Sequence, residues 1–351
     1  MQPLGSGVVV QQGYSTATDV AMAPCATRAA ADWYFAAGST VGGGQQWLSI
    51  FDPFAIDAVV DIEAYSESGF HAPGSLQGLI VRAGSRISVR IDRAVAEQKH
   101  VAIGVHVRNN SRVVTTEALV RPSPSSRTGI SLSLGAISPA RVWLLADNRS
   151  RVGALQQLVL ANPGDVDATV RVSVVPDVAS VHSAIVHNGH VARFYTVNRV
   201  QALRNFGAAN HDNPALIAST TAAMMPVSFD VAATGSTWIT PLRQYLDARP
   251  GVATVVTAAT QRPLVADELV VLNPGRSSVH VSVVATAAGS VLSGRGLRDV
   301  LVGPGGAVTI SLVGLARTGA AAVVTATGPV VAERFVGGPW GVTRSEGVPA
   351  G

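Results

Sequence analysis

Three stretches of the chain share one pattern, and the first of them is Trp47-Leu48-Ser49-Ile50-Phe51-Asp52-Pro53. An apolar run ends at a proline, and a second run, residues 58–65, alternates apolar and polar residues. Such a pair of runs is typical of two strands in an antiparallel sheet. The pattern returns at residues 158–163 and 270–274, with the prolines 110 and 111 residues apart. The sequence therefore predicts repeats of one β-unit.

The composition supports a β-rich chain with more than one domain. Of its 351 residues, 47% are apolar and only 14% are charged, which is enough to fill two or three cores. Val and Ala supply most of the apolar residues, with Thr, Ser and Gly between them. This mixture favours strands and turns over long helices.

The first complete unit spans residues 33–121. A hairpin bent at Ala83-Gly84-Ser85 leads into the strictly alternating residues 86–91, and further strand-like runs cover 101–107 and 112–117. About seven short strands in roughly 90 residues are typical of an immunoglobulin-like sandwich. The predicted fold is all-β, with three tandem immunoglobulin-like β-sandwich repeats.

The remaining boundaries follow from the spacing of turns. Pro53 precedes Gly84 by 31 residues, whereas Pro163 precedes Gly235, which we take as the counterpart of Gly84, by 72. The second repeat is therefore predicted to carry an insertion lobe. The predicted parts are an N-terminal strand segment 1–32, repeat 1 over 33–121, a linker and connecting strand 122–141, repeat 2 over 142–268 with the insertion 177–226, and repeat 3 over 269–351.

Two short segments carry further predictions. In the insertion, Asn188-Gly189 between strand-like runs predicts a hairpin, and residues 200–225 have a helical composition. Near the N-terminus, residues 7–11 match the closing strand of a repeat better than its beginning. Either they are the remnant of a preceding portion, or this strand completes a sheet elsewhere.

Charge and cysteine content exclude several classes of protein. The net charge is +4, but the arginines are scattered singly and few aromatic residues accompany them, so we expect no nucleic-acid partner. Cys25 is the only cysteine, which excludes an intrachain disulfide and a thiolate metal cage. No apolar run reaches the roughly 18 residues of a membrane-spanning helix. Residues 1–4 and their surroundings show no signal peptide, so no integral membrane segment or export signal is predicted.

Four features together resemble a known family. They are the opener Trp33-Tyr34-Phe35-Ala36-Ala37-Gly38-Ser39-Thr40, the Asp-Pro or Asn-Pro after the next strand, the Ala83-Gly84-Ser85-Arg86 hairpin and a Val-Val strand that ends near an acid. This combination resembles an uncharacterised family of exported actinobacterial proteins, domain of unknown function 5719. The resemblance implies a secreted or cell-envelope β-sandwich protein. Because the family has no established activity, it implies no site residues.

The candidate metal ligands are His187 and His190, which flank the Asn188-Gly189 turn. As a cross-strand pair they would have Cβ atoms about 5 Å apart, close enough to share a metal ion. A third ligand would have to come from His182, His211 or Asp212, and no spacing requires it. The simpler interpretation is an exposed polar hairpin tip.

Two other sets of residues allow a functional and a structural interpretation. Asp61 and Glu63 share one face of a strand, which suits a calcium ion or a carboxylate pair, or simply a solvent-facing surface. The tryptophans recur at corresponding places of the repeats, which favours core packing over a sugar-binding platform. The full set of recurring aromatic residues is Trp33, Tyr34, Trp47, Trp143, Trp238 and Trp340.

These observations favour a non-catalytic scaffold or binding protein of the cell envelope or another extracytoplasmic site. It would have no cofactor and would bind an envelope protein or glycan; its oligomeric state is left open. One alternative is a carbohydrate-binding accessory protein of envelope glycan metabolism. The other is a metal-binding or hydrolytic protein that uses the insertion in repeat 2.

Overall fold

The computed structural model describes residues 11–15, 20–121, 129–146, 155–174, 191–204, 215–219, 228–232, 236–239, 252–255, 266–287, 290–292, 297–313, 321–338, 341–346 and 348–349. Throughout these residues the regular elements are β-strands, with one 3-10 turn, η1 (Gly74–Leu76). The all-β prediction is confirmed. Within the same residues, no helix has the length and apolar character needed to cross a membrane.

The first two sheets pack face to face and form sheet pair 1. The opening sheet contains β3 (Asp32–Phe35), β9 (Val101–Val107), β5 (Ala58–Ser66), β6 (Gly69–His71) and β7 (Leu79–Val81). The closing sheet has the order β11 (Gly129–Leu134), β10 (Val114–Arg121), β4 (Gln45–Phe51) and β8 (Arg86–Arg90). Alternate residues of both sheets point inward and form one core, which includes Trp33, Leu48, Ile62 and Ile103.

Sheet pair 2 has the same arrangement. Its opening sheet is β12 (Val142–Leu145), β17 (Ala215–Ser219), β14 (Ala168–Val174) and β15 (Val191–Val197), and its closing sheet is β16 (Val200–Arg204), β13 (Leu155–Ala161), β18 (Ser228–Ala232) and β19 (Ser236–Ile239). Trp143, Leu158, Leu160 and Val170 belong to the core between them.

Sheet pair 3 completes the set. Its opening sheet contains β20 (Val252–Val255), β26 (Ala321–Ala326), β22 (Val279–Ala287), β23 (Ser290–Leu292), β24 (Val300–Val302) and β29 (Val348–Pro349). Its closing sheet is β25 (Ala307–Ser311), β21 (Ala266–Leu272), β27 (Val331–Gly338) and β28 (Gly341–Glu346). Leu269, Val271, Val281 and Val324 lie in its core.

The strand order is the same in the three closing sheets. Read from one edge, they are β11-β10-β4-β8, β19-β18-β13-β16 and β28-β27-β21-β25. The first strands of the three opening sheets, β3, β12 and β20, begin at residues 32, 142 and 252, which is a regular spacing of 110. The three sheet pairs therefore resemble one another in the positions of their strands as well as in their sequence pattern.

The strand pairing of sheet pair 2 does not agree with the predicted insertion lobe at 177–226. β15, β16 and β17 lie within that range, yet each pairs with a strand of sheet pair 2. β16 pairs with β13 as β8 pairs with β4, so Val200–Arg204, and not the segment after Gly235, is the counterpart of the strand after Gly84. Within residues 200–225 a helix was predicted, but the described parts, 200–204 and 215–219, are strands, because strand pairing outweighs the helix propensity of Ala and Leu. Residues 175–190, with the predicted Asn188-Gly189 turn, lie outside the described residues.

Two predicted boundaries also differ from the strand pairing. β11 lies within the predicted linker 122–141 but pairs with β10, so it belongs to sheet pair 1. β20 precedes the predicted start of repeat 3 at residue 269, yet it pairs with β26 of sheet pair 3. β11 alternates apolar and polar residues and β20 has only four residues, but periodicity does not identify the neighbour of a strand, so the sequence assigned neither to a sheet.

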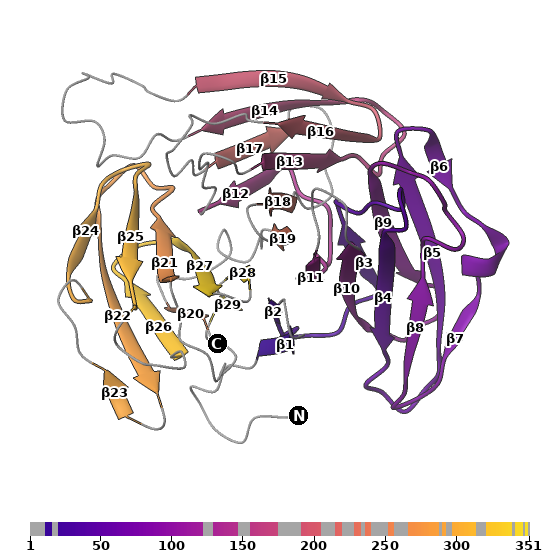
Figure 1. The fold of residues 1–351 in the computed structure, drawn as a ribbon, viewed down its shortest axis with the longest axis horizontal. Helices are drawn as coiled ribbons and strands as arrows, with labels where there is room; N and C mark the ends of the chain where they lie inside the picture. The colour runs from indigo at the N-terminus through magenta and orange to yellow at the C-terminus, as the bar shows by residue number, and fades with distance from the viewer. Residues whose placement is uncertain are drawn as a thin grey trace.

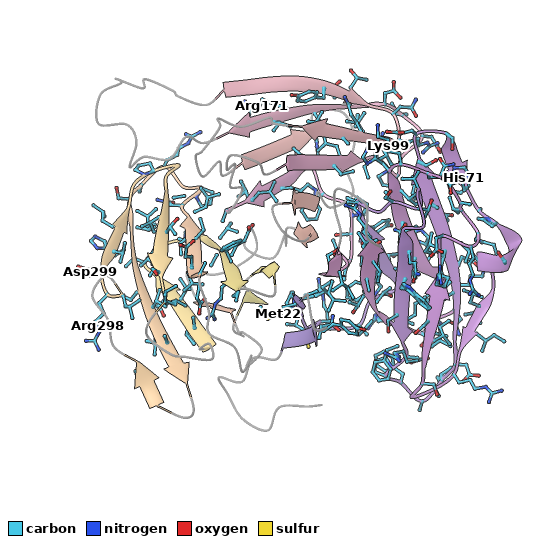
Figure 2. The ribbon with its side chains drawn as sticks, in the orientation of Figure 1. Met22, His71, Lys99, Arg171, Arg298 and Asp299 are labelled. Carbon is cyan, nitrogen blue, oxygen red and sulfur yellow. The ribbon has the colours of Figure 1, made fainter. Side chains whose placement is uncertain are left out.

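The three sheet pairs lie around a common centre, with pair 1 in purple, pair 2 in pink and pair 3 in orange and yellow (Figure 1). The N-terminal strands β1 (Gln11–Ser15) and β2 (Val20–Pro24) form a separate hairpin. At the centre, β2 contacts β11 and β28, and β19 contacts both of those strands as well. Ala21, Met22 and Ala23 of β2 are buried, and Figure 2 shows Met22 in this central region.

Apolar contacts join neighbouring sheet pairs. Ala36, Tyr65 and Ala102 of pair 1 form a buried cluster with Ala161 of pair 2. A further cluster joins pairs 2 and 3 and consists of Leu144, Ala146, Val270, Leu272 and Val331. In both cases the opening sheet of one pair contacts the outward face of the closing sheet of the next.

Candidate functional site

A polar network covers the outward face of the opening sheet of pair 1. Strand alternation places Asp61 and Glu63 of β5 on this face, as predicted. The register sets Asp32 of β3 beside His106 of β9, and His106 beside Asp61. In the next row, Tyr34 and Glu63 flank Gly104. The strand pairing thus gathers acidic, imidazole and phenol groups within a few ångströms.

Gly104 makes room for the imidazole of His106. A Cβ atom at Gly104 would lie only 2.8 Å from His106 Nε2, so the ring leans over this glycine. In this position Nδ1 lies 2.7 Å from Asp32 Oδ1, and Nε2 lies 3.4 Å from Glu63 Oε2. The Tyr34 ring meets the imidazole edge to face, with centroids 5.6 Å apart. A carboxylate oxygen therefore lies within 4 Å of each ring nitrogen of His106.

The network continues toward sheet pair 2 through Tyr65. Its hydroxyl donates to Glu63 Oε2 at 2.6 Å, and the guanidinium of Arg199 from pair 2 lies 6.0 Å from its ring centroid. Burial, with Asp32 and Glu63 nearby, raises the pKa of Tyr34 to about 12. Burial and the hydrogen bond to Glu63 also raise the pKa of Tyr65. Both tyrosines therefore stay neutral and serve as hydrogen-bond and packing groups at neutral pH.

Asp61 and Glu63 have different hydrogen-bond partners. Burial alone would raise the pKa of the Asp61 carboxyl, but hydrogen bonds from the Arg108 side chain and the Gly78 amide outweigh it and hold this pKa below its usual value. Glu63 instead faces His106 and Tyr65. The two carboxylates on one face are thus engaged by separate partners in an ion-pair network.

The contacts in this network are hydrogen bonds and ion pairs. His106 lies between two carboxylates, and neither of them is a nucleophilic hydroxyl or thiol of the kind that a histidine base activates. In the part of the chain that the structure describes, no group of three or more His, Cys, Asp or Glu residues could hold a metal ion. Through Glu63 and Tyr65, the network connects His106 of sheet pair 1 to Arg199 of sheet pair 2.

The predicted metal ligands His187 and His190 lie outside the described residues, as do His182, His211 and Asp212. The structure therefore neither brings them together nor separates them. Cys25 is half-buried, and this burial raises the pKa of its thiol, which weakens its nucleophilic character.

Two of the tryptophans have the predicted core position. Trp33 and Trp143 are each 1% exposed, and their indole N–H groups donate to Val113 O at 2.7 Å and Ala140 O at 3.1 Å. Trp47 is half-buried beneath Arg90, whose guanidinium carbon lies 4.8 Å from the ring centroid. The side chains of Trp238 and Trp340 lie outside the described part of the structure.

Sequence reasoning missed two buried polar pairs at one place in two closing sheets. Gln46 Nε2 donates to Glu117 Oε1 at 2.7 Å in pair 1, and burial raises the pKa of Glu117 to about 8. In pair 3, Arg334 forms two 2.6 Å hydrogen bonds with Asp267. Leu48 lies opposite Glu117 and Leu269 lies opposite Arg334, so the pairs occupy equivalent positions. The signal was a charged residue at an inward position of an alternating strand.

Comparisons with known proteins give two partial matches. Residues 2–129 match the family model described as a family of unknown function (DUF5719), and residues 167–261 match the FtsX extracellular domain. The second match suggests an extracytoplasmic protein. Neither the curated proteins nor the solved structures give a match to this chain. Over residues 2–129 the chain is therefore similar to the uncharacterised family DUF5719.

Proposed function

We propose that the protein is a non-catalytic, extracytoplasmic scaffold that binds a protein or glycan of the cell envelope. In this proposal the three sheet pairs are tandem immunoglobulin-like sandwiches. Two antiparallel sheets packed over one core, with the same closing-sheet order each time, support that interpretation.

The observation that carries the scaffold role is the way the sheet pairs are joined. The buried clusters around Ala161 and around Leu272 contain side chains from both neighbours. In addition, the Ala146 amide of pair 2 donates to Glu333 Oε1 of pair 3 at 2.9 Å, in a buried position. Such contacts resist hinge motion, so the sheet pairs would present their surfaces in fixed relative positions.

The polar network around His106 supports the same role. Its groups pair with one another, and Arg199 extends it to pair 2. A network of this kind favours one arrangement of the two sheet pairs, whereas a catalytic base needs a free face toward a substrate. The match to an extracellular domain supports the proposed location.

Lys99 offers a direct test of location. It is the only lysine and is exposed; Figure 2 labels it on sheet pair 1. A membrane-impermeant amine-reactive reagent is applied to intact cells that produce the chain, and the peptide containing Lys99 is examined by mass spectrometry. We expect labelling before lysis, with the variant Lys99→Arg as the negative control. Labelling only after lysis would contradict an extracytoplasmic location.

The carbohydrate-binding alternative has one supporting observation. Phe54, next to the Pro53 turn, is 46% exposed, and an exposed aromatic ring can stack on a sugar. The purified chain and its Phe54→Ala variant are applied to an array of envelope glycans. Saturable binding that the variant loses would favour this alternative, and a shared absence of binding would leave a protein partner.

A further inference from the structure

The turn after β4 carries two large apolar side chains, more than the equivalent turns after β13 and β21. Phe54 takes the place of Gly164 and Gly275, and in all three turns the amide of this residue donates to the side chain before the proline. Phe54 is 46% exposed, and Ile56, two residues further, is 71% exposed. Since glycine serves at the place of Phe54 in the other two turns, the turn geometry does not require an exposed aromatic ring there.

Three segments meet at this end of sheet pair 1, and we call them the tip: residues 51–57, 82–86 and 108–112. The Gly84 amide donates to Phe54 O at 3.1 Å, and Ser111 Oγ donates to Ile56 O at 3.4 Å. Phe51, the last residue of β4, also belongs to the tip and is 40% exposed. The tip therefore presents three apolar side chains from a turn that the neighbouring segments hold in place.

The backbone of this turn already has hydrogen-bond partners within the protein. The Phe54 amide donates to Asp52 Oδ1 at 2.8 Å, and Asn109 Nδ2 donates to Asp57 O at 2.7 Å. The carbonyls of Phe54 and Ile56 accept the two bonds given above. A backbone group that loses its hydrogen bond in an apolar environment costs free energy. These groups would keep their bonds if the turn left water, so the tip suits an apolar boundary.

Exposed arginines accompany the apolar side chains. Arg82, Arg86 and Arg112 are exposed, and Arg86 lies opposite the last residue of β4 in the strand register. Asp57 is the one exposed acid within the three segments of the tip, and its Oδ1 accepts the Ala83 amide at 2.8 Å. The exposed charge of the tip is therefore positive and complements an anionic surface.

A lipid surface fits this combination better than a glycan or a protein does. Apolar side chains of a surface element enter the boundary between head groups and acyl chains, while arginines attract anionic lipids. Sugar stacking needs an aromatic ring, but the most exposed of the three apolar side chains is Ile56. A protein partner needs a surface shaped to this turn, whereas a bilayer accepts any protruding apolar group.

We propose that the tip of sheet pair 1 binds the surface of a bilayer that contains anionic phospholipids. Phe54 and Ile56 enter the boundary layer, and Arg82 and Arg86 lie at the phosphate groups. This inference goes beyond the scaffold role, because it gives the protein an attachment to lipid in addition to a protein or glycan partner. It does not depend on which of those partners the scaffold binds.

Vesicle binding by the full-length chain tests this inference. The chain is mixed with phosphatidylcholine vesicles, with and without phosphatidylglycerol, and the bound fraction is measured by co-sedimentation. We expect saturable binding to the anionic vesicles that weakens as salt is added, because salt screens the arginines. Phe54→Ser with Ile56→Ser should weaken binding about tenfold or more, since two apolar groups no longer enter the lipid. Arg82→Gln with Arg86→Gln should weaken it about fivefold for each arginine removed.

Val166→Ser is the matched control. Val166 is 70% exposed at the place of Ile56 in the turn after β13, but Asp165 and Asp167 flank it, so this variant should bind vesicles like the original chain. No binding to anionic vesicles, or an equal loss in Val166→Ser, would overturn the proposal. So would glycan binding that Phe54→Ala loses in the absence of vesicle binding, since the tip would then hold a sugar. The labelling of Lys99 tests the extracytoplasmic location independently of these results.

Discussion

β4 and β21 take the same place in their closing sheets, yet their burial differs. In β21 the run Leu269, Val270, Val271 and Leu272 is buried throughout, whereas β4 buries Leu48 and Ile50 and leaves Trp47 and Ser49 half-buried and Phe51 exposed. The inward residues fill a core in both. The outward residues differ because sheet pair 2 covers β21, and no described sheet pair covers β4 in the same way. An alternating or continuous apolar run therefore reports whether a strand has one neighbouring layer or two.

The largest expected effect is a charge placed on the covered face. Val270→Asp buries a carboxylate between sheet pairs 2 and 3 at a position 0% exposed, and we expect a loss of about 5 kcal/mol in the free energy of unfolding. Ser49→Asp, at the corresponding place in β4, should change it by less than about 1 kcal/mol. Urea unfolding followed by circular dichroism measures both. Similar losses for the two variants would contradict the difference between the faces.

The buried pair of sheet pair 3 should respond next most strongly. Arg334→Met leaves the Asp267 carboxylate, which is 1% exposed, without its two charged hydrogen bonds. We expect a loss of about 3–5 kcal/mol, because an unpaired buried charge is retained. The double variant Arg334→Met with Asp267→Leu removes both charges and should recover most of this loss. If the double variant is no more stable than the single one, the pair contributes by packing and not by charge.

The corresponding pair in sheet pair 1 is Gln46 and Glu117, and it should make the free energy of unfolding depend on pH. The cause here is the burial of a carboxyl group and not the loss of a charged partner. Burial raises the pKa of Glu117 to about 8 from its usual value near 4.5, so the folded chain binds a proton that the unfolded chain releases between these pH values. Its contribution to stability is complete below about pH 4.5 and is lost as pH rises through about 8, with a slope of at most about 1.4 kcal/mol per pH unit.

The variant Glu117→Gln removes this titration. Urea unfolding at several pH values should show a flatter profile for the variant and a higher stability than the original chain above pH 8. Ser49→Ala supplies the comparison, since it changes no titratable group and should leave the slope unchanged. An unaltered slope in Glu117→Gln would assign the pH dependence to another group.

The sequence predicted the strands that end at Pro53, Pro163 and Pro274 because a run followed by Asx-Pro is a local signal. It also placed the turn glycine Gly84, which adopts a φ of 66°, a region that glycine favours. Gly305 follows Pro274 by 31 residues, as Gly84 follows Pro53, and adopts a similar φ of 63°. It misplaced the outer strand of sheet pair 2, since Asn198-Arg199 stands where pair 1 has Gly84-Ser85. Asn198 does not adopt a positive φ, so the chain turns there with another backbone geometry that needs no glycine.

The candidate site was also predictable only in part, because some of it depends on neighbouring residues and some on strands far apart in the sequence. Asp61 and Glu63 lie two residues apart on one strand, so alternation alone predicted their shared face. Their partners His106 and Asp32 come from β9 and β3, and only the register of those strands brings them together. Periodicity gives the face of a strand but not its neighbour, so the network could not be derived before the sheet order was known.

The smallest expected effect concerns the side chain before each proline. In sheet pair 3, Asn273 Nδ2 donates to Ser277 O at 2.8 Å and Val302 O at 3.1 Å. Sheet pair 1 has Asp52 instead. Its Oδ1 accepts the Phe54 amide at 2.8 Å, but its Oδ2 is buried without a hydrogen-bond partner. A carboxylate cannot donate to the carbonyls at this place.

Asp52→Asn supplies the missing donor, and we expect it to raise the free energy of unfolding by about 1 kcal/mol. Asn273→Asp makes the reverse change in sheet pair 3 and should lower it by about 1–3 kcal/mol, because the carbonyls that Nδ2 now satisfies lose their donor. Urea unfolding of both variants at one pH measures the two signs. If Asp52→Asn destabilises the chain, the turn of sheet pair 1 satisfies its carbonyls in another way, and the two turns are similar in sequence only.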